Sequence, residues 1–140
     1  MSEARTNIAS GSPYEPIIGF SRAVRIGDRI AVGGTAPIGT DGKTFALGDP
    51  AAQTRRCLEI IKQALEEAGG GLEHVIRTRM FLTDASHWEE VGKAHGEVFG
   101  KIRPASTMVE VSGLLDPDWL VEIEADAVLS GRRNSSGERE

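Results

Sequence analysis

Three carboxylates near the end of the chain are the clearest candidates for chemistry. In the run Leu120–Leu129, apolar residues alternate with Glu122, Glu124 and Asp126. Because successive side chains of a strand point to opposite faces, this alternation predicts a strand that carries all three carboxylates on one face. A carboxylate in such a position can transfer protons, or it can serve only to neutralise a nearby cation.

Two arginines provide a structural alternative to a catalytic role. Arg77 and Arg79 alternate inside a second predicted strand, Leu72–Asp84, so their side chains share a face. Ion pairs with Glu122 and Glu124 would explain these carboxylates without any reaction. Both interpretations are open at this point.

A pair of glycines interrupts another predicted strand. The run Arg29–Ala36 reads RIAVGGTA, and Gly33 and Gly34 lie in its interior. Glycine weakens a strand unless a bulge, or a ligand that approaches the backbone closely, requires it. Phe20 begins the preceding run, and its ring belongs either to the core or to the wall of a site.

Other classes of function are disfavoured. The three histidines, His74, His87 and His95, lack a cluster of cysteines or carboxylates at ligand spacing, so we expect no metal and no cofactor. The net charge of −5, without a basic footprint, disfavours nucleic-acid binding. The sequence shows neither a membrane-spanning stretch nor a signal peptide, and its single cysteine, Cys57, excludes an internal disulfide. We therefore expect a cytoplasmic protein that does not contact membranes.

The expected elements follow the order ββαβαββ. Gly27-Asp28 predicts a hairpin turn between the first two strands, 20–26 and 29–36. The other predicted elements are a helix over 50–68 capped by Asp49, the strand over 72–84, a helix over 86–99 capped by Ser86, and a second hairpin formed by 106–111 and 120–129.

The length of 140 residues suits one domain. We expect a flexible lead-in over residues 1–16, a single domain over 17–129 and a disordered polar tail over 130–140. Two helices on one face of a mixed sheet would form a two-layer α+β domain. The other sheet face also needs cover, which predicts self-association.

Three blocks of this sequence resemble the YjgF/Rid family of reactive-intermediate imine/enamine deaminases, also called endoribonuclease L-PSP. They are RIAVGGTAPI, AAQTRRCLEIIKQALEEAGGGLEHVIRTRMFLTD and RPASTMVEVSGL…VEIEADAV, and the resemblance covers about residues 17–129. It implies a chorismate-mutase-like fold and a homotrimer with three intersubunit clefts for small carboxylate or carbonyl metabolites. In the family's best-studied branch these clefts hydrolyse an imine or enamine to a keto acid and ammonia.

The resemblance also assigns candidate site residues. Glu122 matches the catalytic glutamate of the family's EIEA segment. Gly34 matches a glycine whose backbone donates to the substrate, with Gly33 in place of a neighbouring serine. Phe20 replaces a cleft tyrosine and keeps the ring without the hydroxyl.

The substrate anchor differs from the branch pattern. The branch reads P-A-R-S-C-V-E-V, whereas this chain reads P-A-S-T-M-V-E-V, so Ser106 replaces the carboxylate-binding arginine and Met108 replaces the cysteine. Ser106 and Thr107 can donate hydrogen bonds in its place. Arg103 precedes the proline, and an offset of three residues moves a side chain by about 10 Å along an extended segment. The expectation is therefore an imine or enamine deaminase, or a small-metabolite-binding protein that retains the trimer and cleft without catalysis.

Overall fold

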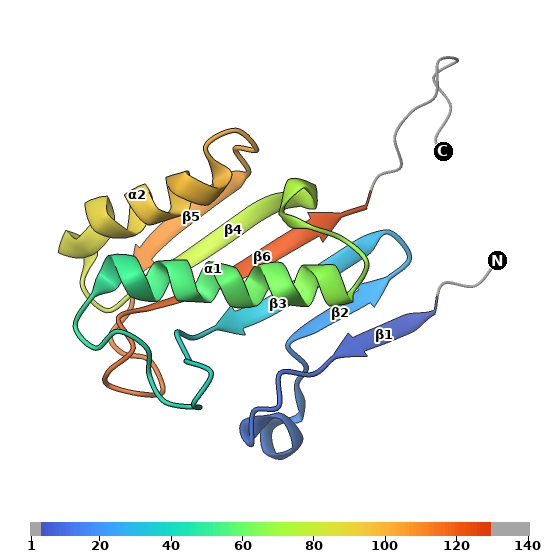
Figure 1. The fold of residues 1–140 in the computed structure, drawn as a ribbon, viewed down its shortest axis with the longest axis horizontal. Helices are drawn as coiled ribbons and strands as arrows, with labels where there is room; N and C mark the ends of the chain where they lie inside the picture. Colours follow the sequence, from blue (N-terminus) through green and yellow to red (C-terminus); the bar gives the residue numbers. More distant parts are fainter. Residues whose placement is uncertain (1–3, 130–140) are drawn as a thin grey trace.

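The computed structural model describes residues 4–129, which form a six-stranded mixed sheet with two helices on one face (Figure 1). The strand order across the sheet is β1-β2-β3-β6-β4-β5. The tail predicted over 130–140 lies outside the described residues. The strands are β1 (Arg5–Ile8), β2 (Ala23–Ile26), β3 (Arg29–Thr35), β4 (Val75–Leu82), β5 (Ala105–Glu110) and β6 (Val121–Val128), and the helices are α1 (Pro50–Glu67) and α2 (Trp88–Phe99). The two-layer α+β class is confirmed.

Helix α1 begins as predicted. The Asp49 side chain accepts a hydrogen bond from the backbone N–H of Ala52 at 3.0 Å, and Pro50 occupies the first helical turn. Its apolar stripe packs against the sheet, and Cys57, Ile61 and Leu65 are fully buried. Local sequence therefore decides both where this helix starts and which face it buries.

Helix α2 starts differently from the prediction. Ser86 is not its cap, because Asp84 instead accepts a hydrogen bond from the Ser86 N–H at 2.9 Å and caps a short turn at Ala85–His87. Helix α2 follows that turn at Trp88, and its buried residues face the sheet. The aspartate two residues upstream outcompetes the serine because it forms this turn locally.

The first predicted hairpin is confirmed, and the second is wrong. Strands β2 and β3 pair across Gly27, whose φ of 59° needs glycine. Strands β5 and β6 do not pair in the described chain: β5 runs parallel to β4, whereas β6 lies between β3 and β4 and is antiparallel to both. The reason is burial, since every second residue of β6 is at most 2% exposed and requires a central position, whereas β5 is largely exposed and tolerates the edge.

The lead-in expected over residues 1–16 is also partly wrong. Arg5–Ile8 forms β1, which pairs antiparallel with β2 at the edge of the sheet, and Glu15–Gly19 forms a single helical turn. An edge strand needs only the unpaired backbone groups of its neighbour, so its own sequence does not have to alternate. The element order is therefore βββαβαββ.

The two faces of the sheet have different surroundings. Both helices cover one face, and the hydrophobic core lies between them and the sheet (Figure 1). The alternation predicted for β6 is confirmed, so Glu122, Glu124 and Asp126 lie on the face opposite the helices. Exposed apolar residues share that face, with Ile26 40% and Val109 43% exposed.

Candidate functional site

Glu122 lies directly over the backbone of Gly34. The Glu122 side chain is half-buried, and a Cβ added at residue 34 would overlap its Oε1 atom. A Cβ at Gly33 would meet only backbone oxygens at 3.7 Å, which is an ordinary contact. Glycine is therefore required at residue 34 for this position of the carboxylate, and not at residue 33.

A β-bulge explains why the two glycines lie in the interior of a strand. Strand β3 pairs with β6 at Val32↔Ala125 and next at Thr35↔Ile123, so three steps along β3 match two along β6. The extra residue interrupts the ladder and leaves backbone groups without a strand partner. The bulge interpretation of Gly33-Gly34 is thus confirmed, and the bulge lies beside the carboxylate.

Arg22, the residue immediately before β2, binds this bulge. Its Nη1 atom donates hydrogen bonds to the carbonyl oxygens of Gly33 at 3.2 Å and Gly34 at 2.5 Å, and to Thr35 Oγ1 at 3.0 Å. The guanidinium therefore satisfies the carbonyl groups that the bulge releases.

Arg22 was not among the residues predicted for the site. The signal that identifies it is the hairpin itself: counting back from the Ile26↔Arg29 pair places Arg22 opposite Gly33. The backbone agrees, because the Gly33 N–H donates to Arg22 O at 2.9 Å. An arginine opposite a glycine pair in a predicted hairpin was thus readable in the sequence.

Phe20 joins the site through the same arginine. The Cζ atom of Arg22 lies 5.9 Å from the centroid of the Phe20 ring, within the range of a cation–π contact. Phe20, Gly33 and Gly34 therefore contact Arg22, and Glu122 lies over Gly34.

Burial governs the protonation of this cluster. Desolvation raises the pKa of Glu122 above its ordinary value, and the charge of Glu124 adds to the rise, whereas the charge of Arg22 opposes it. Burial also lowers the pKa of the Arg22 guanidinium, which nevertheless remains a cation. A carboxyl group whose pKa is shifted towards neutrality is suited to both taking and giving a proton.

The ion pair expected for Glu124 is confirmed and the one expected for Glu122 is not, and the third carboxylate, Asp126, also pairs with Arg79. Arg79 Nη1 lies 3.3 Å from Glu124 Oε1 and 3.4 Å from Asp126 Oδ2. Within residues 4–129, no side chain forms a hydrogen bond or a close ion pair with Glu122. Glu122 thus differs from Glu124 and Asp126, because no described cation forms a close ion pair with it.

The β5 residues expected at the site lie elsewhere within one chain. Phe81 of β4 pairs with Glu122 on one side and with Val109 of β5 on the other. Ser106 is three residues from Val109, about 10 Å along the strand, and β5 is separated from β6 by the whole of β4. One subunit therefore does not bring Ser106 to Glu122.

Ser106 instead ends a polar chain on the helix-covered side of the sheet. Its Oγ lies 2.8 Å from Thr78 Oγ1, which lies 2.9 Å from Nε2 of His95 on α2. Thr78 is fully buried, and Met108 also faces α2, where it packs against the core. Thr107 pairs with Arg79 in register and is exposed.

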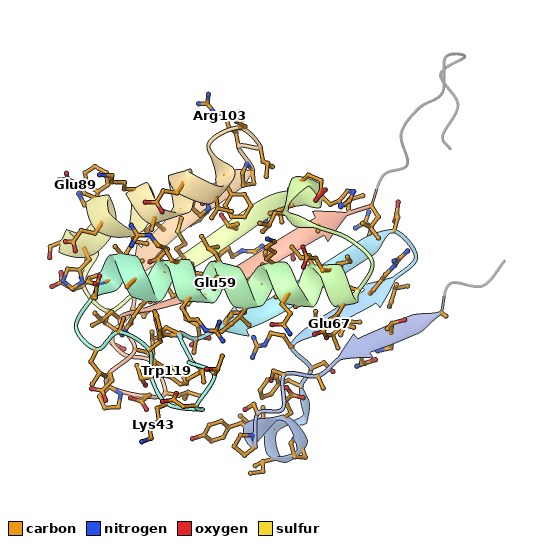
Figure 2. All side chains as sticks on the ribbon, in the orientation of Figure 1. Lys43, Glu59, Glu67, Glu89, Arg103 and Trp119 are labelled. Carbon is orange, nitrogen blue, oxygen red and sulfur yellow. The ribbon has the colours of Figure 1, made fainter. Side chains whose placement is uncertain are left out.

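Arg103 also lies away from Glu122. It is exposed in the turn before β5, with φ at 56°, and Figure 2 shows its side chain extending outward beyond the end of α2. Only a second chain could bring Arg103 and a Glu122 carboxylate into one site.

The remaining groups with reactive potential are inert or scattered. Burial raises the pKa of the Cys57 thiol, which keeps it protonated and unreactive. Between residues 4 and 129, no three His, Cys, Asp or Glu side chains lie close enough together to hold a metal ion. In the same part of the chain, none of the helices has the length and apolarity required to cross a bilayer.

Comparison with known proteins identifies the family. The model of the family described as Endoribonuclease L-PSP matches residues 11–129. The chain is 41% identical over 126 residues to an uncharacterized protein of Streptomyces coelicolor, covering 90% of this chain and 93% of that one. It is 35% identical over 120 residues to the 3-aminoacrylate deaminase RutC of Acinetobacter baylyi, covering 86% of this chain and 94% of that one.

Solved structures agree with the sequence matches. A member of the YjgF/YER057c/UK114 family from Mycobacterium tuberculosis superposes with a TM-score of 0.82 at 50% identity, covering 89% of this chain and 99% of that chain. The chain therefore belongs to the YjgF/Rid family, as the sequence blocks predicted.

Proposed function

We propose that this protein hydrolyses the C=N bond of small imines or enamines, with Glu122 as the proton-transferring group. The observation that carries the proposal is the position of Glu122: a half-buried carboxyl with a raised pKa, free of ion pairs, over a glycine backbone and beside a cation. The relative named as a 3-aminoacrylate deaminase suggests enamines of short carboxylic acids as substrates.

Hydrolysis of a C=N bond requires few groups beyond this arrangement. Glu122 takes a proton from a water molecule while the water oxygen bonds to the imine carbon, and it then returns a proton to the nitrogen. In the resulting carbinolamine, Glu122 takes the hydroxyl proton and delivers it to the amino nitrogen, so the C–N bond breaks, ammonia leaves and a carbonyl forms. For an enamine, a first proton transfer to carbon generates the imine.

A trimer with clefts between subunits would complete the site. Within one chain, Thr107 of β5 lies two strands from Glu122 and Arg103 precedes that strand, so these two groups can reach the carboxylate only from a neighbouring copy, whereas Ser106 faces the helix-covered side. Within residues 4–129, no helix covers the sheet face that carries Glu122, and this face exposes Ile26 and Val109, which association would bury.

Ammonia release from a dehydratase-generated substrate tests the proposal. The purified protein should accelerate hydrolysis of 2-aminoacrylate or 3-aminoacrylate, and Glu122→Gln should lower kcat/KM by about 10²–10⁴-fold because the proton-transfer group is lost. Asp126→Asn is the matched control, since Asp126 lies on the same face but pairs with Arg79. Equal loss in both variants, or full activity in Glu122→Gln, would refute the role of Glu122.

A binding protein without catalysis is the second candidate. Ser106 favours this second candidate, because its hydroxyl is hydrogen-bonded to Thr78 and cannot replace the charge-assisted hydrogen bonds of an arginine to a carboxylate. In that case no hydrolysis would be found, whereas titration calorimetry would detect binding of small keto acids such as pyruvate, and Glu122→Gln would weaken it. The acidic net charge of −5 supports neither candidate over the other, but it disfavours RNA as the substrate.

A further inference from the structure

We propose that Arg22 is the positioning residue for Glu122: it clamps the Gly33-Gly34 bulge beneath the carboxylate and supplies the positive charge that faces it. The proposal goes beyond the function proposed above by assigning a role to a residue outside the predicted site. Its structural part can be tested whether or not the protein hydrolyses imines.

The clamp acts on the backbone. One nitrogen of Arg22, Nη1, donates to the carbonyl oxygens of Gly33 and Gly34 and to the hydroxyl of Thr35, and Thr35 Oγ1 in turn donates to Gly33 O at 2.8 Å. Glycine has the largest backbone conformational freedom of any residue. The three hydrogen bonds from the planar guanidinium therefore restrict the backbone of Gly33-Gly34, which would otherwise be the most mobile part of the bulge.

The arginine is itself held in place. Its backbone N–H donates to Ile8 O of β1 at 2.8 Å, its backbone carbonyl accepts from Gly33, and its guanidinium lies 5.9 Å from the centre of the Phe20 ring. The edge strand β1 therefore has a function in this arrangement, because it fixes the residue that fixes the bulge.

The guanidinium also carries more donors than the clamp uses. Its Nε atom is buried, and no described side chain or backbone group accepts a hydrogen bond from it. An unpaired buried donor costs free energy, so a residue selected for packing alone would not be an arginine here. Retaining the charge at this cost is consistent with an electrostatic role.

The charges around Glu122 can be enumerated from every neighbouring element. On its own strand, Glu124 repels it; Arg22, which immediately precedes β2, attracts it; and the buried Cys57 thiol of α1 is neutral. Arg79 of β4 is engaged with Glu124. Glu15, in the turn before β2, also interacts with Arg22 and partly offsets its charge. Arg22 is thus the cation among the described residues that opposes the effect of burial on Glu122.

Two substitutions separate the clamp from the charge. Arg22→Gln removes both, whereas Arg22→Lys keeps the charge and loses the planar group that reaches three acceptors. Arg25→Gln is the matched control, because Arg25 lies three residues further along, in β2, and also binds backbone carbonyls, those of Gly27 at 2.9 Å and Ala68 at 2.7 Å, away from Glu122.

The readouts are the titration of the Glu122 side-chain carboxyl by ¹³C NMR and amide hydrogen exchange at Gly34 and Thr35. Arg22→Gln should shift the Glu122 titration to higher pH and speed exchange in the bulge at least tenfold. Arg22→Lys should speed exchange with a smaller titration shift, and Arg25→Gln should change neither. If the protein proves active, the acidic limb of the kcat/KM profile should move to higher pH in Arg22→Gln.

The proposal is overturned if the Glu122 titration in Arg22→Gln coincides with that in Arg25→Gln, or if exchange in the bulge is unchanged. An inactive wild-type protein that shows both NMR effects would refute the proposed hydrolysis while leaving the role of Arg22 intact. If Arg22→Gln does not fold, Arg22→Lys alone decides the clamp by hydrogen exchange.

Discussion

Gly34 of β3 lies against the side chain of Glu122 on the adjacent strand β6. The Glu122 carboxylate fills the space that a Cβ at residue 34 would occupy. The contact exists because the bulge in β3 brings residue 34 under β6 without a side chain between the strands. Steric fit therefore links the identity of residue 34 to the position of the candidate catalytic group.

Gly34→Ala should displace the Glu122 carboxylate and lower kcat/KM by about 10²-fold, as expected for a misplaced catalytic group. The fold should survive, because the atom that must move is the end of a flexible side chain. Gly33→Ala is the matched control, since its Cβ finds only ordinary contacts, and steady-state kinetics on both variants is the measurement. Similar kcat/KM values for the two variants would contradict the steric link between Gly34 and Glu122.

Glu122→Gln should stabilise the protein at pH 7 and have a smaller effect at pH 4. Burial holds the pKa of Glu122 above the ordinary value of 4.5, so the folded state binds this proton more tightly than the unfolded state does. The free energy of unfolding therefore falls as pH rises from the pKa of Glu122 in the unfolded chain to its higher pKa in the folded protein. Glutamine does not titrate, so the variant does not undergo this fall. Urea unfolding at the two pH values measures it, and a variant that is less stable than wild type at pH 7 would show that Glu122 is not desolvated.

Thr78→Val should destabilise the protein by about 1–3 kcal/mol, because it removes the buried hydroxyl between His95 and Ser106 and leaves the His95 Nε2 atom without its partner. Thr107→Val, at an exposed position of β5, should change stability by less than about 0.5 kcal/mol. Urea midpoints of both variants give the comparison. Equal midpoints would mean that the polar chain contributes nothing to the docking of α2.

Because of His95, the free energy of unfolding should decrease at acidic pH. Burial lowers the pKa of His95 in the folded state below the ordinary value of 6.5, so the unfolded chain takes up this proton more readily as pH falls through that value. Wild type should therefore lose stability between pH 7 and pH 5 relative to His95→Gln, which cannot gain the charge. Chemical unfolding across this range is the test, and parallel pH curves for the two proteins would exclude the effect.

Light scattering should give a mass close to three times the chain mass of 15.0 kDa. Val109→Lys should lower that mass towards the monomer, because it places a charge on the sheet face opposite α1 and α2. Trp88→Lys, at an apolar residue of α2 that is 59% exposed, is the control and should leave the mass unchanged. A monomeric wild-type protein would refute both the predicted trimer and the predicted intersubunit cleft.

Local sequence was sufficient for the elements whose signals lie within a few residues. The Asp49-Pro50 start of α1, the turn at Gly27 between β2 and β3, and the alternation of β6 are all present as predicted. Caps, tight turns and periodicity arise from contacts between near neighbours in the chain, and a single sequence displays them directly. The family blocks likewise identified the fold.

Contacts between distant segments required the tertiary structure. Only the fold shows that β6 enters the sheet between β3 and β4, that Arg5–Ile8 adds an edge strand, and that Ser106 faces α2 instead of Glu122. Strand pairing is decided by which apolar faces must be buried against each other, and this depends on the whole chain. The sequence by itself therefore determined the family and the identity of Glu122 as a candidate, whereas the register of β3 on β6 decided that Gly34 lies beneath Glu122 and Arg22 beside it.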